Sequence, residues 1–263
     1  MLELVDIGCN LADRAFASDR EEVIRRALDA GVCQMVLTGT TVDESRAALE
    51  IARARQGVLF CTAGVHPHYV RDCGEQTLGA LRELHGESEV VAMGECGLDF
   101  FRDLSPRDVQ EQWFVAQIAL GAELGKPLFV HDRQAFDRCH AILEEHRSDF
   151  SRAVVHCFTA EEKELRGYLD LDLHIGITGW VCDERRGTHL REIVRYVPSD
   201  RLMIETDAPY LLPRTIRPRP KSRRNEPAFL SWVLDELASC RGEDREQLAR
   251  STTAVAREFF GLR

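Results

Sequence analysis

The first chemical signal in this sequence is a set of ionisable residues that follow short apolar runs. The runs at 91–93, 127–130, 153–155 and 202–204 lead, within three residues, to Glu95, His131, His156 and Asp207 respectively. Burial of an unpaired ionised group is costly, so such residues need partners. Imidazoles and carboxylates together bind Zn²⁺, Mn²⁺ or Mg²⁺. One such residue would be interpreted as a buried polar side chain satisfied by a neighbour, whereas four of them favour a metal centre.

A histidine pair follows another apolar run. His66 and His68 flank Pro67 in the stretch Gly64–His68. Because proline stiffens the loop, the two imidazoles are expected to point in fixed directions. They could be metal ligands or donors to a phosphate or a leaving group, and we favour anion binding. The alternative is a surface loop with incidental histidines.

Two acids stand close together after the last apolar run. Glu205 and Asp207 are two residues apart, and such residues point the same way in an extended chain. Asp207 is expected to be a ligand or a general base, because it lies nearer the following loop. Glu205 is expected either to support a ligand or to form an ion pair inside the fold.

A basic segment follows these acids in a chain whose formal net charge is −10. That charge excludes a protein that coats nucleic acid through bulk electrostatics, but not an enzyme with a local basic patch. Residues 214–224 hold six basic side chains, including Arg223 and Arg224, and prolines keep the segment extended. This pattern suits a polyanion, although a solvated loop is the alternative. Trp180 is a candidate base-stacking surface, and Phe100 and Phe101 are candidates either for stacking or for packing.

The nine cysteines are scattered, without a Cys-x-x-Cys pair, which indicates reduced thiols and a cytoplasmic protein. Cys96 and Cys157 neighbour candidate ligands in extended segments, so their side chains are expected to point to the opposite side. We therefore do not expect a catalytic cysteine. The N-terminus lacks the pattern of a secretory signal, and no apolar run approaches the roughly 18 residues that span a bilayer, so no membrane association is expected.

The elements that must position these groups alternate regularly along the chain. Apolar runs near residues 2, 33, 58, 91, 127, 153, 173 and 202 are followed by stretches with helical spacing, and two further helices are expected near 226–239 and 243–260. Continuously apolar strands are typical of a parallel sheet that is covered on both faces. We predict one α/β domain over residues 1–263 with the fold of a (β/α)8 TIM barrel, in which catalytic groups come from the carboxyl ends of several strands. A doubly wound open sheet is the alternative, but the first run lacks a glycine-rich phosphate loop.

Several motifs resemble the TatD family of metal-dependent deoxyribonucleases, essentially over the whole chain. They are Gly94–Asp99, Gly64–His68, His156–Phe158 and Glu205–Tyr210. Two further stretches, 6–11 and 176–187, resemble the enterobacterial-type branch of that family. The resemblance implies an amidohydrolase-superfamily barrel and 3′-5′ exonuclease activity on single-stranded DNA and RNA, with Mg²⁺ as the usual ion. A role in DNA repair or nucleic-acid turnover and a monomeric state are expected with it.

The resemblance also implies roles for individual residues. Glu95, His131, His156 and Asp207 would be the metal ligands, Asp207 could also activate the water, and His66 would lie in the substrate pocket. His68, Trp180, Arg223 and Arg224 complete the expected substrate contacts.

The chain departs from the family pattern at its first strand. Most members carry Asp-x-His-x-His there, whereas this chain has Gly8 and Asn10 after Asp6. Glycine offers no ligand atom, so one ion is expected to be held by Glu95 and imidazoles and a second only weakly. A weak site of this kind suits Mg²⁺, which keeps several waters, better than a tightly held Zn²⁺, and Mn²⁺ or Zn²⁺ are the alternative ions.

Two rival functions remain open at this point. One is a small-molecule amidohydrolase or lactonase on the same barrel, because a fold does not fix a function. The other is a nucleic-acid-binding module whose catalysis is weakened by the missing histidine pair.

Overall fold

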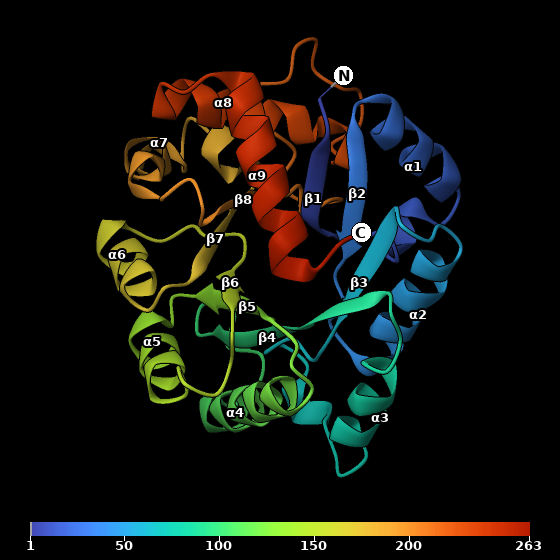
Figure 1. The fold of residues 1–263 in the computed structure, drawn as a ribbon, viewed down its shortest axis with the longest axis vertical. Coiled ribbons are helices and arrows are strands. Elements are labelled where there is room, and N and C mark those ends of the chain that lie inside the picture. Colours follow the sequence, from blue (N-terminus) through green and yellow to red (C-terminus); the bar gives the residue numbers. More distant parts are fainter. Residues whose placement is uncertain (1) are drawn as a thin grey trace.

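Eight parallel strands form one sheet in the order β1 to β8, with helices packed around it (Figure 1). The structure is a computed structural model and describes residues 2–263. The strands are β1 (Leu4–Cys9), β2 (Val32–Leu37), β3 (Leu59–Ala63), β4 (Val90–Asp99), β5 (Leu128–Arg133), β6 (Ala153–Val155), β7 (His174–Ile177) and β8 (Leu202–Ile204). Parallel strands in sequential order confirm the predicted barrel. A doubly wound sheet does not have this order, because its strand order reverses.

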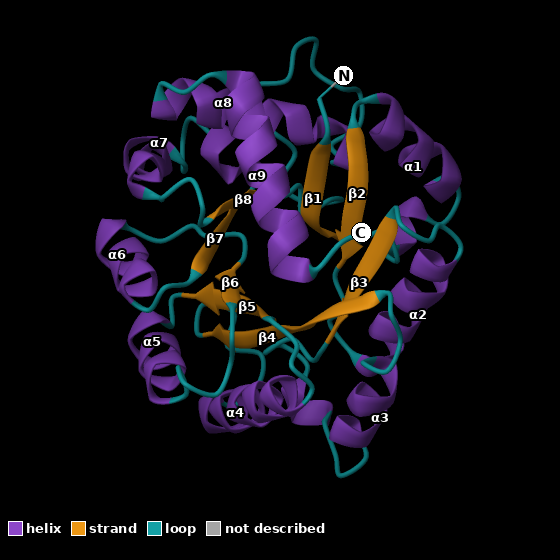
Figure 2. Cartoon of the chain, in the orientation of Figure 1, coloured by secondary structure: helices purple, strands orange, loops and turns teal. Residues whose placement is uncertain are grey.

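Helices alternate with the strands and surround them (Figure 2). They are α1 (Arg20–Asp29), α2 (Val42–Arg53), α3 (Thr77–Leu84), α4 (Arg107–Glu123), α5 (Phe136–Glu145), α6 (Glu162–Asp170), α7 (Thr188–Ile193), α8 (Leu230–Arg241) and α9 (Arg245–Phe260). Short 3₁₀ turns are η1 (Arg14–Phe16), η2 (Val70–Asp72), η3 (Gly179–Cys182), η4 (Val194–Tyr196) and η5 (Pro227–Phe229). Local signals set several helix ends: the Thr41 side chain accepts from the Glu44 N–H at the start of α2, and Gly261 ends α9 in the left-handed region.

The barrel closes between β1 and the segment that follows β8. The Asp207 N–H donates to the Gly8 carbonyl over 2.8 Å, and the Asn10 N–H donates to the Ala208 carbonyl over 2.7 Å. The buried Asp6 carboxylate adds a side-chain link, because it accepts from the Thr206 N–H at 2.9 Å. The first strand and the segment after the last strand therefore meet at the side chains that carry the chemistry.

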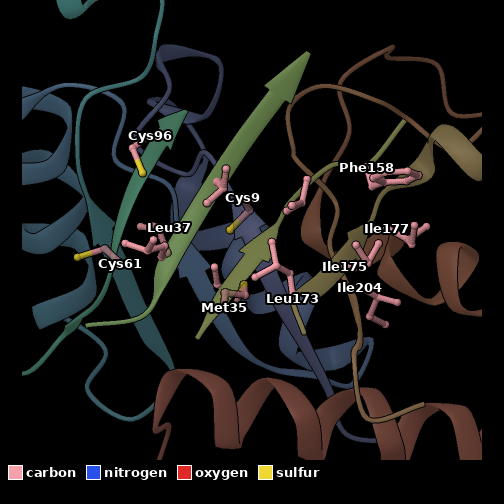
Figure 3. Close-up of a cluster of buried hydrophobic side chains, with 14 of the residues drawn as sticks. Cys9, Met35, Leu37, Cys61, Cys96, Phe158, Leu173, Ile175, Ile177 and Ile204 are labelled. Carbon is pink, nitrogen blue, oxygen red and sulfur yellow. The ribbon is translucent and has the colours of Figure 1, made fainter. Parts of the chain in front are cut away.

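The strands are apolar on both faces because each face packs against a different layer. Leu173, just before β7, and Ile175 and Ile177 within it occupy alternate positions and pack outward in the core between strands and helices (Figure 3). Cys96 belongs to this outer core, so its thiol points away from the Glu95 side of β4, as predicted.

One end of the barrel interior is filled by apolar side chains. Phe129 and Met203 belong to a buried cluster there, together with Phe259 and Phe260 of α9. Helix α9 crosses the barrel in Figure 1, and its last turn supplies the two phenylalanines. This apolar cluster is the floor on which the polar site rests, and we call it the floor cluster (Val5, Ile7, Val36, Phe60, Val91, Ala92, Phe129, Val154, Met203, Ala256, Phe259, Phe260 and Leu262).

Two local expectations differ from the structure. Strand β4 continues to Asp99, so Glu95 lies within the strand rather than at its end. Strand β8 stops at Ile204, so Glu205 and Asp207 do not belong to one regular extended segment, and Asp207 adopts a left-handed φ of 53°. In the part of the chain that the structure describes, no helix has the length and apolarity to cross a membrane.

Candidate metal centre

One oxygen of the Glu95 carboxylate lies at the centre of three imidazoles. Oε1 lies 2.7 Å from His156 Nε2, 2.9 Å from His131 Nδ1 and 3.3 Å from His66 Nε2. All four side chains are largely or fully buried, with His131 the most exposed at 17%. The structure thus brings together three of the four residues expected as ligands, and it adds His66 to them.

The backbone around Glu95 explains why the sequence places it between glycines. The β4–β5 register shifts between Gly94 and Cys96, which marks an irregularity in the ladder at Glu95. Gly94 and Gly97 have φ values of 148° and 136°, and a Cβ on either residue would collide with a carbonyl oxygen of β5. Only glycine fits this close approach, which lets an ionisable residue turn into the barrel from the middle of a strand.

Two further carboxylates hold the far nitrogens of the imidazoles. His131 Nε2 lies 3.4 Å from Asp99 Oδ2, and His156 Nδ1 lies 3.3 Å from Glu205 Oε2. A carboxylate on the second ring nitrogen fixes the orientation of a ligand histidine and raises its basicity. The expected supporting role of Glu205 therefore has a geometric basis. Asp99 was missed, although it stands four residues after Glu95 on the same strand and alternate residues share a face.

His68 contacts this outer layer rather than Glu95. Its Nε2 lies 2.7 Å from Asp99 Oδ2, and its backbone N–H donates to His66 Nδ1 over 3.0 Å. The Pro67 turn therefore directs one imidazole to each of two carboxylates, Glu95 and Asp99. His68 also lines the cavity, so a contact to substrate remains a prediction.

Asp207 lies across the site, beside the residue that replaces a family histidine. The Asn10 side-chain amide donates to Asp207 Oδ1 over 3.1 Å. Burial raises the pKa of Asp207 to about 7, and the negative charge of Glu95 adds to this increase. This amide contact keeps Asp207 turned toward β1.

The position of Gly8 is filled from the other side of the barrel. A Cβ at position 8 would collide with Glu205 Oε2, and the Phe129 ring would lie 3.2 Å away. Glu205 is fully buried there and accepts a hydrogen bond from the Cys157 N–H. The missing side chain and the buried acid are therefore complementary: a histidine at position 8 would need the volume that Glu205 occupies.

The protonation of the three imidazoles differs with their surroundings. Burial lowers the pKa of His66 to about 4, so this imidazole is neutral at pH 7. Although burial opposes the charged form of His131, hydrogen bonds to Asp99 and Glu95 raise its pKa to about 9. The pKa of His156 is likewise raised, against the effect of burial, by its two carboxylate neighbours. Imidazoles that share protons with buried carboxylates are groups from which a metal cation displaces protons.

The donor set fits a divalent cation. Single donor atoms of His66, Glu95 and His131 all lie within 4.8 Å of one another, and His156 shares the same carboxylate oxygen. Mixed imidazole and carboxylate donors suit Zn²⁺, Mn²⁺ or Mg²⁺. This group of three residues contains His66, which was not expected as a ligand, and lacks His156 and Asp207, which were. The ligand set itself therefore stays a prediction.

The centre lies at one wall of a large open cavity of about 1340 Å³. Acidic side chains in its lining outnumber the lysine and arginine side chains. The acids are Asp13, Glu44, Glu95, Asp132, Asp137, Glu161, Glu164 and Asp207, and the bases are Arg102, Arg133, Arg138, Lys163 and Arg186. A polyanion would therefore meet a mostly acidic wall, and a bound cation would offset that charge.

The structure does not bring the basic segment into this cavity. Neither Arg223 nor Arg224 is among the lining residues. The Arg224 guanidinium donates to Asp19 and Glu226 and lies 4.9 Å from the centre of the Phe16 ring. Its expected contact with substrate stays a prediction, but its side chain already has structural partners.

Trp180 and Cys157 both line the cavity. Trp180 presents its ring beneath the Arg186 guanidinium, whose carbon lies 4.3 Å from the ring centre. The expectation that Cys157 points away is wrong: β6 ends at Val155, and Cys157 adopts a positive φ of 46°. Burial raises the pKa of its thiol well above the usual value, so Cys157 is not a nucleophile of the activated type.

The chain matches the profile of a family described as TatD related DNase over residues 5–261. A Pantoea ananatis protein named 3'-5' ssDNA/RNA exonuclease TatD is 52% identical, with 98% of this chain and 100% of the relative covered. A Shigella flexneri protein of the same name is 48% identical over 98% of this chain and 99% of the relative.

Solved structures share the fold at lower identity. A TatD family hydrolase from Entamoeba histolytica superimposes with a TM-score of 0.90 at 24% identity, covering 98% of each chain. The TatD homologue YJJV from Escherichia coli K12 gives 0.89 at 24% identity, covering 99% of this chain and 98% of the other. At this identity, the likeness supports the barrel alone.

Proposed function

This chain belongs to the TatD-related DNase family, and we propose that it is a metal-dependent 3′-5′ exonuclease that hydrolyses phosphodiester bonds of single-stranded DNA and RNA. The observation that carries this proposal is the Glu95 carboxylate, surrounded by three imidazoles in the wall of an open cavity. A nucleic-acid strand can enter such a cavity by its end. The relatives named as exonucleases match this chain over essentially their full length, which supports the substrate class.

Glu95, His131 and His156 would hold the divalent ion, with His66 or Asp207 as a further donor. When bound, the ion would polarise the phosphodiester and lower the pKa of a water molecule. We favour Mg²⁺ because Gly8 and Asn10 supply no imidazole, and Mg²⁺ is usually held by few protein oxygens and several waters.

The side chains around the ion have separate tasks. Asp207 would take a proton from the attacking water, since it is a carboxylate at the cavity wall with only Asn10 as a side-chain hydrogen-bond partner among residues 2–263. His66 accepts the His68 N–H at Nδ1, so its neutral imidazole carries the proton on Nε2, and where His66 is not a metal ligand it would donate this N–H to a phosphate oxygen. Asp99 and Glu205 would keep the rings of His131 and His156 in place.

For the remaining residues, we propose only which part of the substrate each one contacts. Trp180 at the cavity wall could stack on a base, and His68 could reach a phosphate. Arg223 is exposed and Arg224 is ion-paired, so we expect them to act at a distance from the reacting bond. We further propose one domain over residues 1–263, a monomer, and a reducing compartment such as the cytoplasm, since all nine cysteines are free.

The test is degradation of a 5′-labelled single-stranded oligonucleotide with Mg²⁺, Mn²⁺, Zn²⁺ or a chelator. We expect a ladder of shortened labelled products with a divalent ion and none with the chelator. A matched strand labelled at its 3′ end should release labelled mononucleotide first. Equal rates with metal and with chelator would contradict the proposal.

Two outcomes would favour the rival functions. Hydrolysis of small esters or cyclic amides without any cutting of strands would favour a small-molecule hydrolase. Binding of strands without cutting, under every divalent ion tried, would favour a nucleic-acid-binding module.

A further inference from the structure

Four of the five exposed large apolar side chains among residues 2–263 gather at the mouth of one cavity. Tyr69, Phe101, Leu104 and Tyr210 are 42%, 50%, 40% and 54% exposed, and all four line the cavity that holds Glu95. They come from the loops after β3, β4 and β8. Apolar side chains that gather at a rim of this kind mark a binding surface rather than a folding requirement.

One of these side chains is paired with an arginine. The Arg133 guanidinium carbon lies 4.1 Å from the centre of the Phe101 ring. Among residues 2–263, neither Arg133 nor Arg102, the residue after Phe101, forms an ion pair, unlike the other basic residues of the cavity wall. Those others pair as Arg138 with Glu111, Lys163 with Asp137, and Arg186 with Asp183. The mouth of the cavity therefore offers a half-exposed aromatic ring beside the Arg133 guanidinium, and a second arginine without an ion pair, Arg102, lines the same cavity.

This surface is fixed to the metal centre by a single carboxylate. Asp99 Oδ1 accepts from the Phe101 N–H over 3.0 Å and from the Arg102 N–H over 2.7 Å. The other oxygen, Oδ2, lies 3.4 Å from His131 Nε2. The backbone of Arg133 lies opposite that of Asp99 in the β4–β5 ladder. Arg133 is two residues beyond His131 on the same strand. The ring and the guanidinium are therefore held at a fixed place relative to the candidate ligands.

We propose that Phe101 and Arg133 form a nucleotide platform, in which the ring stacks on an unpaired base of the strand held at the metal centre. Arg133, with Arg102, then pairs with a phosphate of the same segment. This inference rests on the proposed function and names the residues that select its substrate. A base within a duplex cannot present its face to the ring, so the platform favours single strands. Every base has a stacking face, so the platform is indifferent to sequence.

The alternative is that arginine merely packs on an exposed ring, and the chain contains a matched control for it. Tyr196 is 39% exposed, and Arg166 and Arg195 lie 4.9 Å and 5.2 Å from its ring centre. Tyr196 is not among the residues that line the cavity. It shares the composition and exposure of the platform but not its place.

The test is the affinity for a fluorescein-labelled octathymidylate with phosphorothioate linkages, measured by fluorescence anisotropy in Mg²⁺. Phe101→Ala should weaken binding by about tenfold, which corresponds to about 1.4 kcal/mol. Phe101→Trp should restore the affinity to within about twofold, since a larger ring also stacks, and Tyr196→Ala should leave it unchanged. Equal affinities of wild type and Phe101→Ala would overturn the platform.

Abasic substitutions separate stacking from a structural role. In strands that lack one base at successive positions from the 3′ end, one position should cost wild type about tenfold in affinity. The same substitution should cost Phe101→Ala nothing further, because the ring it would face is gone. Equal losses in both proteins would contradict a direct ring–base contact.

The platform and the proposed function can fail separately. If wild type degrades strands and Phe101→Ala binds them equally well, the platform is wrong and the exonuclease stands. If wild type degrades no strand with any divalent ion, the exonuclease is wrong, and the same binding comparison still decides the platform. A wild-type protein that binds no single strand would overturn both.

Discussion

The two ends of the barrel interior are built from opposite kinds of side chain. At the amino end the floor cluster is apolar and closed by α9, whereas the carboxyl end holds Glu95 among three imidazoles. The Phe129 ring separates them: its centre lies 4.4 Å from that of His156, in a stacked arrangement, and 6.4 Å from that of Phe260.

The difference teaches that stability and chemistry are divided along the barrel axis. Buried apolar area stabilises the fold, whereas buried ionised groups contribute little net stability and are retained for what they bind. A change at the floor should therefore alter unfolding and spare activity, and a change at the mouth should do the reverse. The predictions below test that division, starting with the largest effect.

Glu95→Ala removes the carboxylate that three imidazoles share. We expect strand degradation to fall by more than about a thousandfold, because the group central to metal binding is lost. The bound metal of the purified variant, measured by elemental analysis, should fall with it. Asp137→Ala removes an exposed acid of the same cavity and is the matched control, with less than about threefold loss. Substantial cutting by Glu95→Ala would place the chemistry elsewhere.

Phe260→Ala opens the floor cluster from α9. Phe260 is 5% exposed, and truncation of a buried phenylalanine costs about 3–5 kcal/mol. Urea unfolding should show this loss, while kcat/KM of the folded variant stays within about twofold of wild type. Phe101→Ala is the matched control for stability, since truncation of a half-exposed ring should change the free energy of unfolding by less than about 0.5 kcal/mol. A floor variant that keeps its stability but loses activity would break the comparison.

Asp99→Asn keeps the shape of the side chain that holds His131 and removes its charge. Loss of such a carboxylate typically costs about 10- to 100-fold in metal affinity or activity. Isothermal titration with Mn²⁺ would measure the affinity. Asp132→Asn is the matched control, because this neighbouring acid bonds to Tyr168 rather than to a candidate ligand. Equal effects of the two variants would argue against a specific role for Asp99.

His174 gives the amino end a dependence on pH. Its ring packs 4.8 Å from that of Phe259, and burial lowers its pKa to about 4. The unfolded chain, with a pKa near 6.5, takes up the proton first, so stability is lost as pH falls from about 6.5 to about 4. After allowance for its partial exposure, the loss is about 2 kcal/mol. In urea unfolding, wild type should lose about 2 kcal/mol more than His174→Gln between pH 7.5 and pH 4.5, and parallel losses would contradict it.

Arg223→Ala should have the smallest effect. The side chain is exposed and does not line the cavity, so we expect less than about twofold change in degradation of single strands at moderate salt. A tenfold loss would move substrate binding from the cavity wall to the segment 214–224. The ion-paired Arg224 would report on stability instead.

The sequence predicted the alternating elements and pointed to the side chains that gather around Glu95, because both leave local patterns. Continuous apolar runs identify buried parallel strands, and an ionisable residue at such a run is conspicuous. It missed the supporting roles of Asp99 and His68, because these two residues contact each other but lie 31 residues apart in the chain. It did not foresee that Arg224, which stays a predicted substrate contact, has an ion-pair partner 2.7 Å away in Asp19, from the other end of the chain.

The sequence by itself determined the barrel, the candidate ligand types and the absence of the first histidine pair, since each depends on residue identity and spacing along the chain. Only the tertiary structure decided that the Glu205 carboxylate fills the space at Gly8, that His66 joins Glu95, and that the free arginines of the mouth are Arg102 and Arg133. Barrel closure brings residues from opposite ends of the chain within hydrogen-bond distance. That proximity depends on the register and twist of all eight strands together, which no local pattern contains.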